Sequence, residues 1–223
     1  MNKEKAVVFE NVSKTIGKKE ILKDVSFDVN KGEVVGIIGD NGAGKTTILR
    51  LASGLSYASG GNVFIDGKKI FSGITGGLPS DVGILIESPK FLENLTGFQN
   101  FYLLSKIQKI IDAAKVEETI KLVGLSPKDK KKVREYSLGM KQRLGIAQAI
   151  MESPSLILFD EPTNALDKEG MILFDEIIRT YKEAGSAFIF VSHSMEEILR
   201  YCDRVYKLEK MTLCLKNKDS LYH

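Results

Sequence analysis

The sequence VVGIIGDNGAGKTTILRLASG, residues 34–54, decides the fold of this chain. Residues 34–38 are an apolar run that predicts a buried strand. Residues 48–52 have helical character and end at Gly54, a common residue after a helix C-terminus. Between the two runs lies a glycine-rich segment that consists of Gly39, Asp40, Asn41, Gly42, Ala43, Gly44, Lys45, Thr46 and Thr47. Strand, glycine loop, Lys-Thr pair and helix, in this order, are the context that the phosphate-loop pattern G-x-x-x-x-G-K-S/T requires.

Each part of this loop has a physical reason to hold phosphate. The glycines let backbone N–H groups turn inward without Cβ clashes, and the following helix adds free N–H groups and the positive end of its dipole. We expect Lys45 to reach the β- and γ-phosphates and the Thr46 hydroxyl to bind Mg²⁺. The alternative, a glycine turn before an amphipathic helix, leaves the Lys-Thr pair unexplained. The loop therefore predicts a nucleoside triphosphate site.

Composition limits the other classes of function. The net charge of +3 is too small to indicate a nucleic-acid partner. No apolar run approaches the ~18 residues of a membrane span, and no signal-peptide segment follows Met1. Cys202 and Cys214 lack metal or redox spacing and suit a reducing compartment. We therefore expect a cytoplasmic protein with an ordinary globular core.

Hydropathy patterns predict the order of the elements. Apolar or alternating runs predict strands at residues 7–12, 25–29, 62–67, 82–86, 156–159, 187–191, 205–208 and 211–215. Helical spacing predicts two or three helices over residues 96–124 and one helix each at residues 139–151, 174–181 and 195–200. Residues 72–79 are rich in glycine and end in proline, which predicts a turn segment.

This order predicts an α/β fold with a mostly parallel, covered sheet around the phosphate loop. The early strands predict an N-terminal antiparallel β layer, and the helical middle predicts an inserted α-helical subdomain. We expect a single domain over residues 1–223. In it, residues 1–90 and 154–223 form the α/β core, and residues from about 91 to 153 form the helical subdomain.

Acidic residues and a histidine follow two of the predicted strands. Asp160 and Glu161 come directly after residues 156–159, at the strand end where α/β folds place ligands. In a phosphate-loop protein an acid here holds Mg²⁺, which we assign to Asp160, and Glu161 could polarise the attacking water. His193 should emerge at the same edge, where an imidazole can donate to charge developing on the γ-phosphate. A lone histidine is otherwise more often structural.

Several segments stand in the order found in ATP-binding cassette (ABC) transporter ATPases. They are GDNGAGKT at residues 39–46, YSLGMKQR at 136–143, DEPT at 160–163, NALD at 164–167 and SH at 192–193. The chain resembles this family from about residue 7 to about residue 215. The resemblance implies the P-loop ABC ATPase fold, with ATP and Mg²⁺ bound. It also implies a head-to-tail dimer of cassettes, in which Ser137 and the Gly139 N–H of one copy cap the γ-phosphate held by the other.

Two departures from the family pattern affect the nucleotide contacts. The usual signature Leu-Ser-Gly-Gly-Gln is replaced by Tyr-Ser-Leu-Gly-Met, so that Leu138 and Met140 stand where the first glycine and the glutamine are usual. Before Gly17 the family usually carries an aromatic residue that stacks on adenine, and this chain has Ile16. Because isoleucine lacks a π face, the loss of stacking should cost about 1 kcal/mol and weaken the preference for adenine.

A third departure is Glu87, which follows residues 82–86 where most members place a glutamine. A carboxylate cannot donate as an amide does, but it is a stronger Mg²⁺ ligand. By the segments Glu-Ser-Pro at residues 87–89, Asn-Leu-Thr at 94–96 and Tyr-Ser-Leu-Gly-Met at 136–140, the chain resembles the branch of bacitracin-resistance and lantibiotic-immunity ATPases, in which glutamate replaces this glutamine. We therefore expect Glu87 to touch the metal and to couple hydrolysis to transport. The alternative is a surface glutamate in a loop.

The leading hypothesis is a transporter ATPase subunit that docks on a separate transmembrane permease at the cytoplasmic face of the membrane. The expected dimer partner is a second cassette, most simply another copy. Residues 92–105, beside Glu87, are the predicted permease-facing surface, although the aromatic side chains there could equally be core. One alternative is an ABC-type ATPase that acts on ribosomes or DNA. Another is a phosphate-loop kinase or GTPase, which would not need the signature segment.

Overall fold

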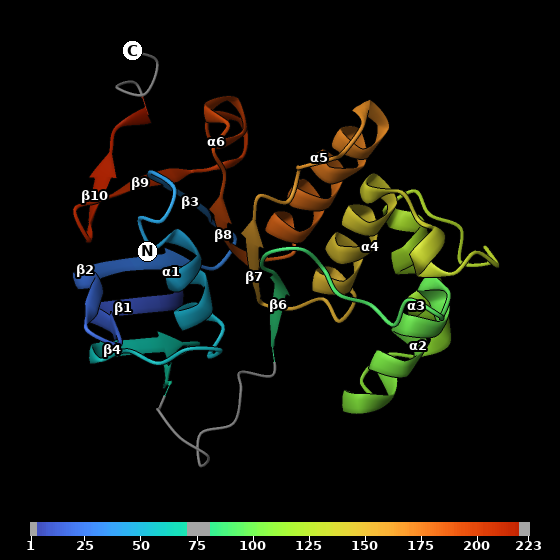
Figure 1. The fold of residues 1–223 in the computed structure, drawn as a ribbon, viewed down its shortest axis with the longest axis horizontal. Helices are drawn as coiled ribbons and strands as arrows, with labels where there is room; N and C mark the ends of the chain where they lie inside the picture. The colour runs from blue at the N-terminus through green and yellow to red at the C-terminus, as the bar shows by residue number, and fades with distance from the viewer. Residues whose placement is uncertain (1–3, 71–80, 219–223) are drawn as a thin grey trace.

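The computed structural model describes residues 4–70 and 81–218, so the turn predicted at residues 72–79 lies outside the described residues. Helix α1 lies between a small antiparallel sheet and a larger central sheet, and the other helices gather beyond the opposite face of the central sheet (Figure 1). None of the helices in the described ranges has the length and apolar character that a membrane span requires.

The elements have the following bounds. The strands are β1 (Lys5–Ile16), β2 (Lys19–Asn30), β3 (Val34–Ile38), β4 (Gly60–Ile65), β5 (Lys68–Lys69), β6 (Val82–Leu85), β7 (Leu156–Asp160), β8 (Ala187–Val191), β9 (Arg204–Glu209) and β10 (Thr212–Lys216). The helices are α1 (Lys45–Ala52), α2 (Gly97–Gln108), α3 (Ala113–Leu122), the short 3-10 helix η1 (Val133–Glu135), α4 (Leu138–Ile150), α5 (Lys168–Glu183) and α6 (Met195–Tyr201).

The strand order confirms the predicted mostly parallel sheet. The central sheet has the order β10-β9-β3-β8-β7-β6, in which every neighbouring pair is parallel except the edge pair β10 and β9. The second sheet has the order β2-β1-β4-β5 and is antiparallel throughout, which confirms the predicted N-terminal β layer. Because β3, β8 and β7 are parallel neighbours, their carboxyl ends share one edge of the sheet.

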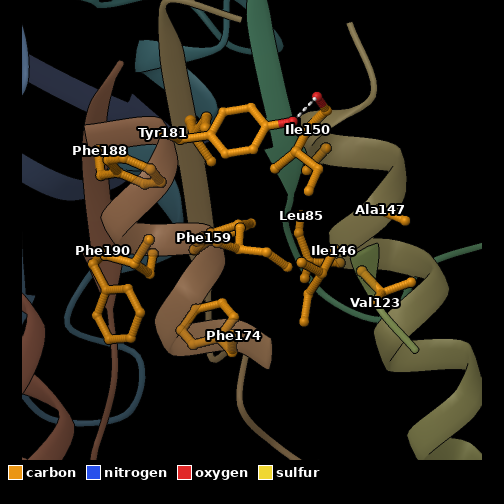
Figure 2. Packing of buried hydrophobic residues seen from close by; sticks show 14 of the residues in the cluster. Leu85, Val123, Ile146, Ala147, Ile150, Phe159, Phe174, Tyr181, Phe188 and Phe190 are labelled. Carbon is orange, nitrogen blue, oxygen red and sulfur yellow. Dashed lines mark hydrogen bonds between the residues drawn. The ribbon is translucent and has the colours of Figure 1, made fainter. Parts of the chain in front are cut away.

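Apart from Asp160 at the end of β7, the strands β3, β7 and β8 contain no polar side chain, because both faces of the sheet are covered. In β7, Leu156 and Leu158 pack toward α1 and the antiparallel layer, whereas Ile157 and Phe159 pack toward the helices on the other face. Phe159 meets Phe174 of α5 with ring centroids 5.6 Å apart. Figure 2 shows this second core, in which the Tyr181 hydroxyl also donates to the Ile150 carbonyl at 3.0 Å. The alternation thus fixes which face each side chain enters.

Strand β1 is longer than the predicted run at residues 7–12 because its polar ends also pair with β2. Val7, Phe9 and Val12 are all buried, although strict alternation would turn Val12 to the other face. The register shifts between Phe9 and Val12, where Asn11 adopts a φ of 48°. This irregularity returns Val12 to the core.

Residues 96–124, for which two or three helices were predicted, contain the helices α2 and α3. Helix α2 begins with a capping box, in which the Gln99 N–H donates to the Thr96 hydroxyl at 3.1 Å and the Thr96 N–H donates to the Gln99 side chain at 3.0 Å. Phe101 is completely buried, whereas Tyr102 is 38% exposed and stacks on Phe98. Of the aromatic residues predicted as either core or docking surface, Phe101 therefore belongs to the core and Tyr102 reaches the surface.

Candidate functional site

The glycine loop connects β3 directly to α1, as its sequence predicted. Gly39 has a φ of 153°, and a Cβ atom there would lie 2.5 Å from the Leu208 carbonyl oxygen of β9, so no larger residue fits. Gly44 is the N-cap of α1. The helix has no acidic residue in its first turn, and its N-terminal N–H groups therefore face the loop without a competing carboxylate. This arrangement can receive phosphate oxygens.

Lys45 is the first residue of α1, and its side chain turns back over the loop. Its Nζ donates to the carbonyls of Gly39 at 2.6 Å and Asp40 at 3.0 Å. Burial lowers the pKa of the Lys45 ammonium, while the nearby Glu161 and Asp160 carboxylates oppose this shift. The cation is thus held within the loop by two carbonyl oxygens that a phosphate could replace as its partners.

Asp160 and Thr46 meet at the site predicted for Mg²⁺. The Thr46 hydroxyl donates to Oδ2 of Asp160 at 2.7 Å, which joins the first turn of α1 to the end of β7. Burial raises the pKa of the Asp160 carboxyl, opposed by the Thr46 hydroxyl and the Lys45 charge. A hydroxyl and a carboxylate side by side are the hard oxygen donors that Mg²⁺ prefers, so these residues fit the ion.

The Glu161 carboxylate lies beside the His193 imidazole. Nε2 of His193 lies 3.4 Å from Oε1 of Glu161. That oxygen is buried and forms no hydrogen bond with any described residue. Burial raises the pKa of the Glu161 carboxyl, which His193 opposes and Asp160 reinforces. A buried acceptor without a donor is costly, and one beside a phosphate site is poised to accept from a ligand or a water molecule.

The backbone at Glu161 is held in an unusual conformation. Its φ is 49°, in the left-handed region that few residues other than glycine adopt. The Glu161 N–H donates to the Val191 carbonyl at 2.9 Å. Gln142 of α4, which the sequence analysis missed, donates to the carbonyls of Glu161 at 3.3 Å and Pro162 at 2.8 Å. Its signal in the sequence was its place in the signature segment, residues 136–143, in which no role was assigned to it.

The signature segment forms the start of α4 and the wall of a second groove. The Ser137 hydroxyl caps α4 by accepting from the Met140 N–H at 3.2 Å, which leaves its own proton free to donate. A Cβ atom on Gly139 would lie 2.8 Å from the Ala165 carbonyl oxygen, so glycine is needed for this close approach. Ser137, Gly139 and Ala165 line a groove of about 490 Å³ that includes none of residues 39–47. The two predicted halves of the nucleotide site therefore stand apart within one chain.

An ion pair that no sequence pattern indicated links this groove to the NALD segment, residues 164–167. The Arg143 guanidinium donates to Asp167 and, at 3.5 Å, to Glu169. Only 10% of the Arg143 side chain is exposed. The hydrogen bond from Arg143 lowers the pKa of Asp167, which also caps α5. Helix α4, which begins in the signature segment, and the NALD segment are thus fixed to each other.

Glu87 lies in a groove of about 380 Å³ that Asp160 and Glu161 also line. Its carboxylate is turned to Arg50 of α1, with 2.6 Å between Oε1 and Nη2, and its side chain is 62% exposed. Ile16 is 57% exposed at the end of β1, where it pairs with Lys19 across the β1–β2 turn. Both residues are accessible, and Glu87 is engaged with a cation while Ile16 is free to cover an adenine ring.

Comparisons with known proteins agree with this geometry. The ABC transporter family profile matches residues 22–164. The chain is 41% identical over 202 residues to the uncharacterized ABC transporter ATP-binding protein YdbJ of Bacillus subtilis, covering 90% of this chain and 65% of that protein. It is 37% identical to the bacitracin transport ATP-binding protein BcrA of Enterococcus faecalis, over 87% of this chain and 63% of that protein. It is 34% identical to the lantibiotic transport ATP-binding protein SrtF of Streptococcus pyogenes, over 87% of this chain and 82% of that protein.

Solved structures share the whole architecture. An ATP-binding subunit of an ABC transporter superposes with a TM-score of 0.87 at 25% identity, covering 96% of this chain and 91% of that one. A dimeric ATP-binding cassette in a post-hydrolysis state, bound to ADP and phosphate, superposes with a TM-score of 0.81 at 26% identity. The superposition covers 95% of this chain and 98% of that one. The chain spans just under two thirds of the length of YdbJ and BcrA and most of the length of SrtF. By sequence, fold and site, this chain belongs to the ABC transporter family of ATP-binding proteins.

Proposed function

We propose that this chain hydrolyses ATP to ADP and phosphate at the carboxyl edge of its central sheet. The observation that carries the proposal is the meeting of three strand ends. Strand β3 leads into the phosphate loop, β7 ends at Asp160 and Glu161, and β8, which lies between them, leads to His193. Acidic, cationic and hydroxyl groups therefore converge beside a loop suited to phosphate.

Each group has a distinct role in this reaction. The loop N–H groups and Lys45 would hold the phosphates, and Thr46 with Asp160 would hold Mg²⁺. Bound Mg²⁺ neutralises charge on the phosphate oxygens. Glu161 would accept the proton of the attacking water, for which its unpaired Oε1 is available. His193 would donate to the charge that develops on the transferred phosphoryl group.

We propose that two copies enclose the nucleotide between them. The groove lined by Ser137 and Gly139 contains no residue of the phosphate loop of the same chain. The free Ser137 proton and the N-terminal N–H groups of α4 would complete the site of a facing copy. A solved structure of similar fold is dimeric in a post-hydrolysis state with ADP and phosphate bound, which supports the pairing of two copies.

Glu161→Gln tests both parts of this proposal. The amide keeps the shape of the side chain but cannot take a proton, so we expect turnover to fall by about 10³-fold while ATP binding persists. Because ATP then stays uncleaved, size-exclusion chromatography with ATP and Mg²⁺ should show a dimer. Full turnover in this variant would remove Glu161 from the mechanism. A monomer under these conditions would contradict the shared site.

We further propose that hydrolysis drives a separate membrane permease that exports or clears peptide antibiotics of the bacitracin or lantibiotic type. The support is the similarity to the bacitracin transport protein BcrA and the lantibiotic transport protein SrtF, which also makes action on ribosomes or DNA the weaker alternative. The chain would then sit at the cytoplasmic face of the membrane, held there by the permease. Co-purification with a polytopic membrane protein is the expected result in cells, and its absence would oppose this assignment.

Glu87 is the residue that we propose for coupling ATP hydrolysis to transport. It lines the groove of Asp160 and Glu161, yet its exposed carboxylate can exchange Arg50 for another partner. Glu87→Ala should lower bacitracin or lantibiotic tolerance in cells by about tenfold, because coupling rather than nucleotide binding is lost. Glu176→Ala, at an exposed position on α5, is the control that should keep tolerance. Unchanged ATPase rate and tolerance in Glu87→Ala would show that Glu87 is a surface residue only.

A further inference from the structure

One carboxylate outside the roles assigned above connects the loops of Glu161 and His193. Oε1 of Glu197, on α6, accepts from the Thr163 hydroxyl at 2.7 Å, and Oε2 accepts from the Ser192 hydroxyl at 2.7 Å. Thr163 lies two residues after Glu161, and Ser192 directly precedes His193. The two oxygens of Glu197 therefore bind one loop each.

Both arms of this bridge are sheltered from water. Thr163 is 7% exposed and Ser192 is 1% exposed, so their hydroxyls have little solvent to bind in place of the carboxylate. Hydrogen bonds to an ionised acceptor are about twice as strong as those between neutral groups. Glu197 has to keep one rotamer to accept from both hydroxyls. The fixed distance between its two carboxylate oxygens then constrains the distance between the Thr163 and Ser192 hydroxyls.

The same contacts fix the backbone around His193. The Ser192 hydroxyl also accepts from the Ser194 N–H at 3.0 Å, which closes the turn that contains the histidine. The Ser194 hydroxyl caps α6 by accepting from the Glu197 N–H at 3.4 Å. On the other arm, Thr163 lies two residues after Glu161, whose left-handed backbone persists only where surrounding contacts hold it.

We propose that Glu197 is a positioning residue that sets the distance between the Glu161 carboxylate and the His193 imidazole. This inference rests on the proposed ATP hydrolysis, in which these two groups act on the same phosphoryl transfer. Without Glu197, the Glu161 N–H still donates to the Val191 carbonyl, but Thr163 and Ser192 lose the side-chain link between the two loops. A displacement of 1 Å in a catalytic group can cost about 10²-fold in rate.

Glu197→Ala should therefore lower kcat by about 10- to 100-fold while KM for ATP changes by less than about threefold, because the phosphate loop is untouched. Glu197→Gln should recover most of kcat, since an amide can accept from one hydroxyl and donate to the other. Asp175→Asn is the matched control. Asp175 holds the opposite end of α6 by accepting from the Tyr201 hydroxyl at 2.5 Å and from Arg200, and it should keep kcat.

A second measurement does not depend on turnover. The chain has two histidines, His193 and His223, so His223→Asn leaves one imidazole to observe by nitrogen NMR. Glu197→Ala should shift the ring nitrogen signals of His193, and Asp175→Asn should not. If Glu197→Ala does not fold, Thr163→Val and Ser192→Ala remove one arm each and should both shift these signals.

The outcomes separate this inference from the proposed function. Loss of turnover in Glu161→Gln together with wild-type kcat and unmoved His193 signals in Glu197→Ala would overturn the positioning role alone. Full turnover in Glu161→Gln would overturn the proposed function, and the His193 signals would still decide whether Glu197 sets the imidazole. An equal fall in kcat for Glu197→Ala and Asp175→Asn would reduce Glu197 to a support of α6.

Discussion

Gly83→Ala probes the contact between the central sheet and the helix that carries the signature segment. Gly83 lies in β6, and a Cβ atom there would stand 1.8 Å from the Ala149 carbonyl oxygen of α4 and 2.8 Å from Cγ of Pro154. The first of these atoms belongs to a helix backbone and cannot rotate away. Strand and helix would have to separate by roughly 1.5 Å before the contact became ordinary.

The expected cost follows from this geometry. Overpacking a core by one methyl group costs about 1–3 kcal/mol, and a clash with backbone places this variant near 3 kcal/mol. For a protein of this size, 1 kcal/mol lowers Tm by about 2–4 °C. We therefore expect Tm to fall by about 6–12 °C. Because α4 also carries Gln142, which holds the Glu161 carbonyl at 3.3 Å, turnover should fall with stability.

Thermal unfolding followed by circular dichroism measures this effect, with Gly60→Ala as the matched control. Gly60 lies in β4, and a Cβ atom there would stand 3.8 Å from Ser13, an ordinary contact. That variant should stay within about 0.5 kcal/mol of the wild type. A difference of about 2 °C in Tm corresponds to at most about 1 kcal/mol of stability. A Gly83→Ala protein whose Tm lies within about 2 °C of that of Gly60→Ala would therefore refute the reasoning that this close approach supports the fold.

Two further predictions concern the adenine contact and acid stability. Ile16→Tyr should tighten ATP binding by about fivefold and raise the preference for ATP over GTP, because a ring worth about 1 kcal/mol of stacking replaces an exposed aliphatic side chain; unchanged affinities by calorimetry would contradict a base contact at this position. Burial opposes ionisation of Glu33, but the Arg204 guanidinium and the Asn30 donors outweigh it and lower the pKa of Glu33 below 4.5. The ionised carboxylate therefore stabilises the fold above pH about 4.5, and this contribution disappears as the pH falls through the folded-state pKa. Glu33→Gln should lose stability at neutral pH and show a flatter decline of Tm in acid, whereas a decline parallel to the wild type would exclude this role.

The groups whose positions were predicted are those that follow apolar strands directly. Asp160, Glu161 and His193 were expected at one sheet edge because each follows an apolar run, and parallel strands end together. Lys45 and Thr46 were placed by the geometry of a single loop. In each case a short local pattern determines the backbone path, and the backbone path determines where the side chain emerges.

The contacts that were not predicted join residues far apart in the chain. Gln142 reaches the Glu161 carbonyl across 19 positions, and Glu197 reaches Thr163 across 34. Polar residues on a helix show no period that identifies their partners, because any exposed face of a helix is polar. The pairing of Glu87 with Arg50 likewise joins the loop after β6 to α1 across 37 positions, which no local pattern records.

The sequence by itself determined the phosphate loop, the order of strands and helices, and the family, since spacing and periodicity depend only on residues close in the chain. The tertiary structure alone decided which hydroxyls and amides hold the loops of Glu161 and His193. These arrangements depend on how the two faces of the central sheet are packed. Their energies come from contacts between elements that meet only in the folded state.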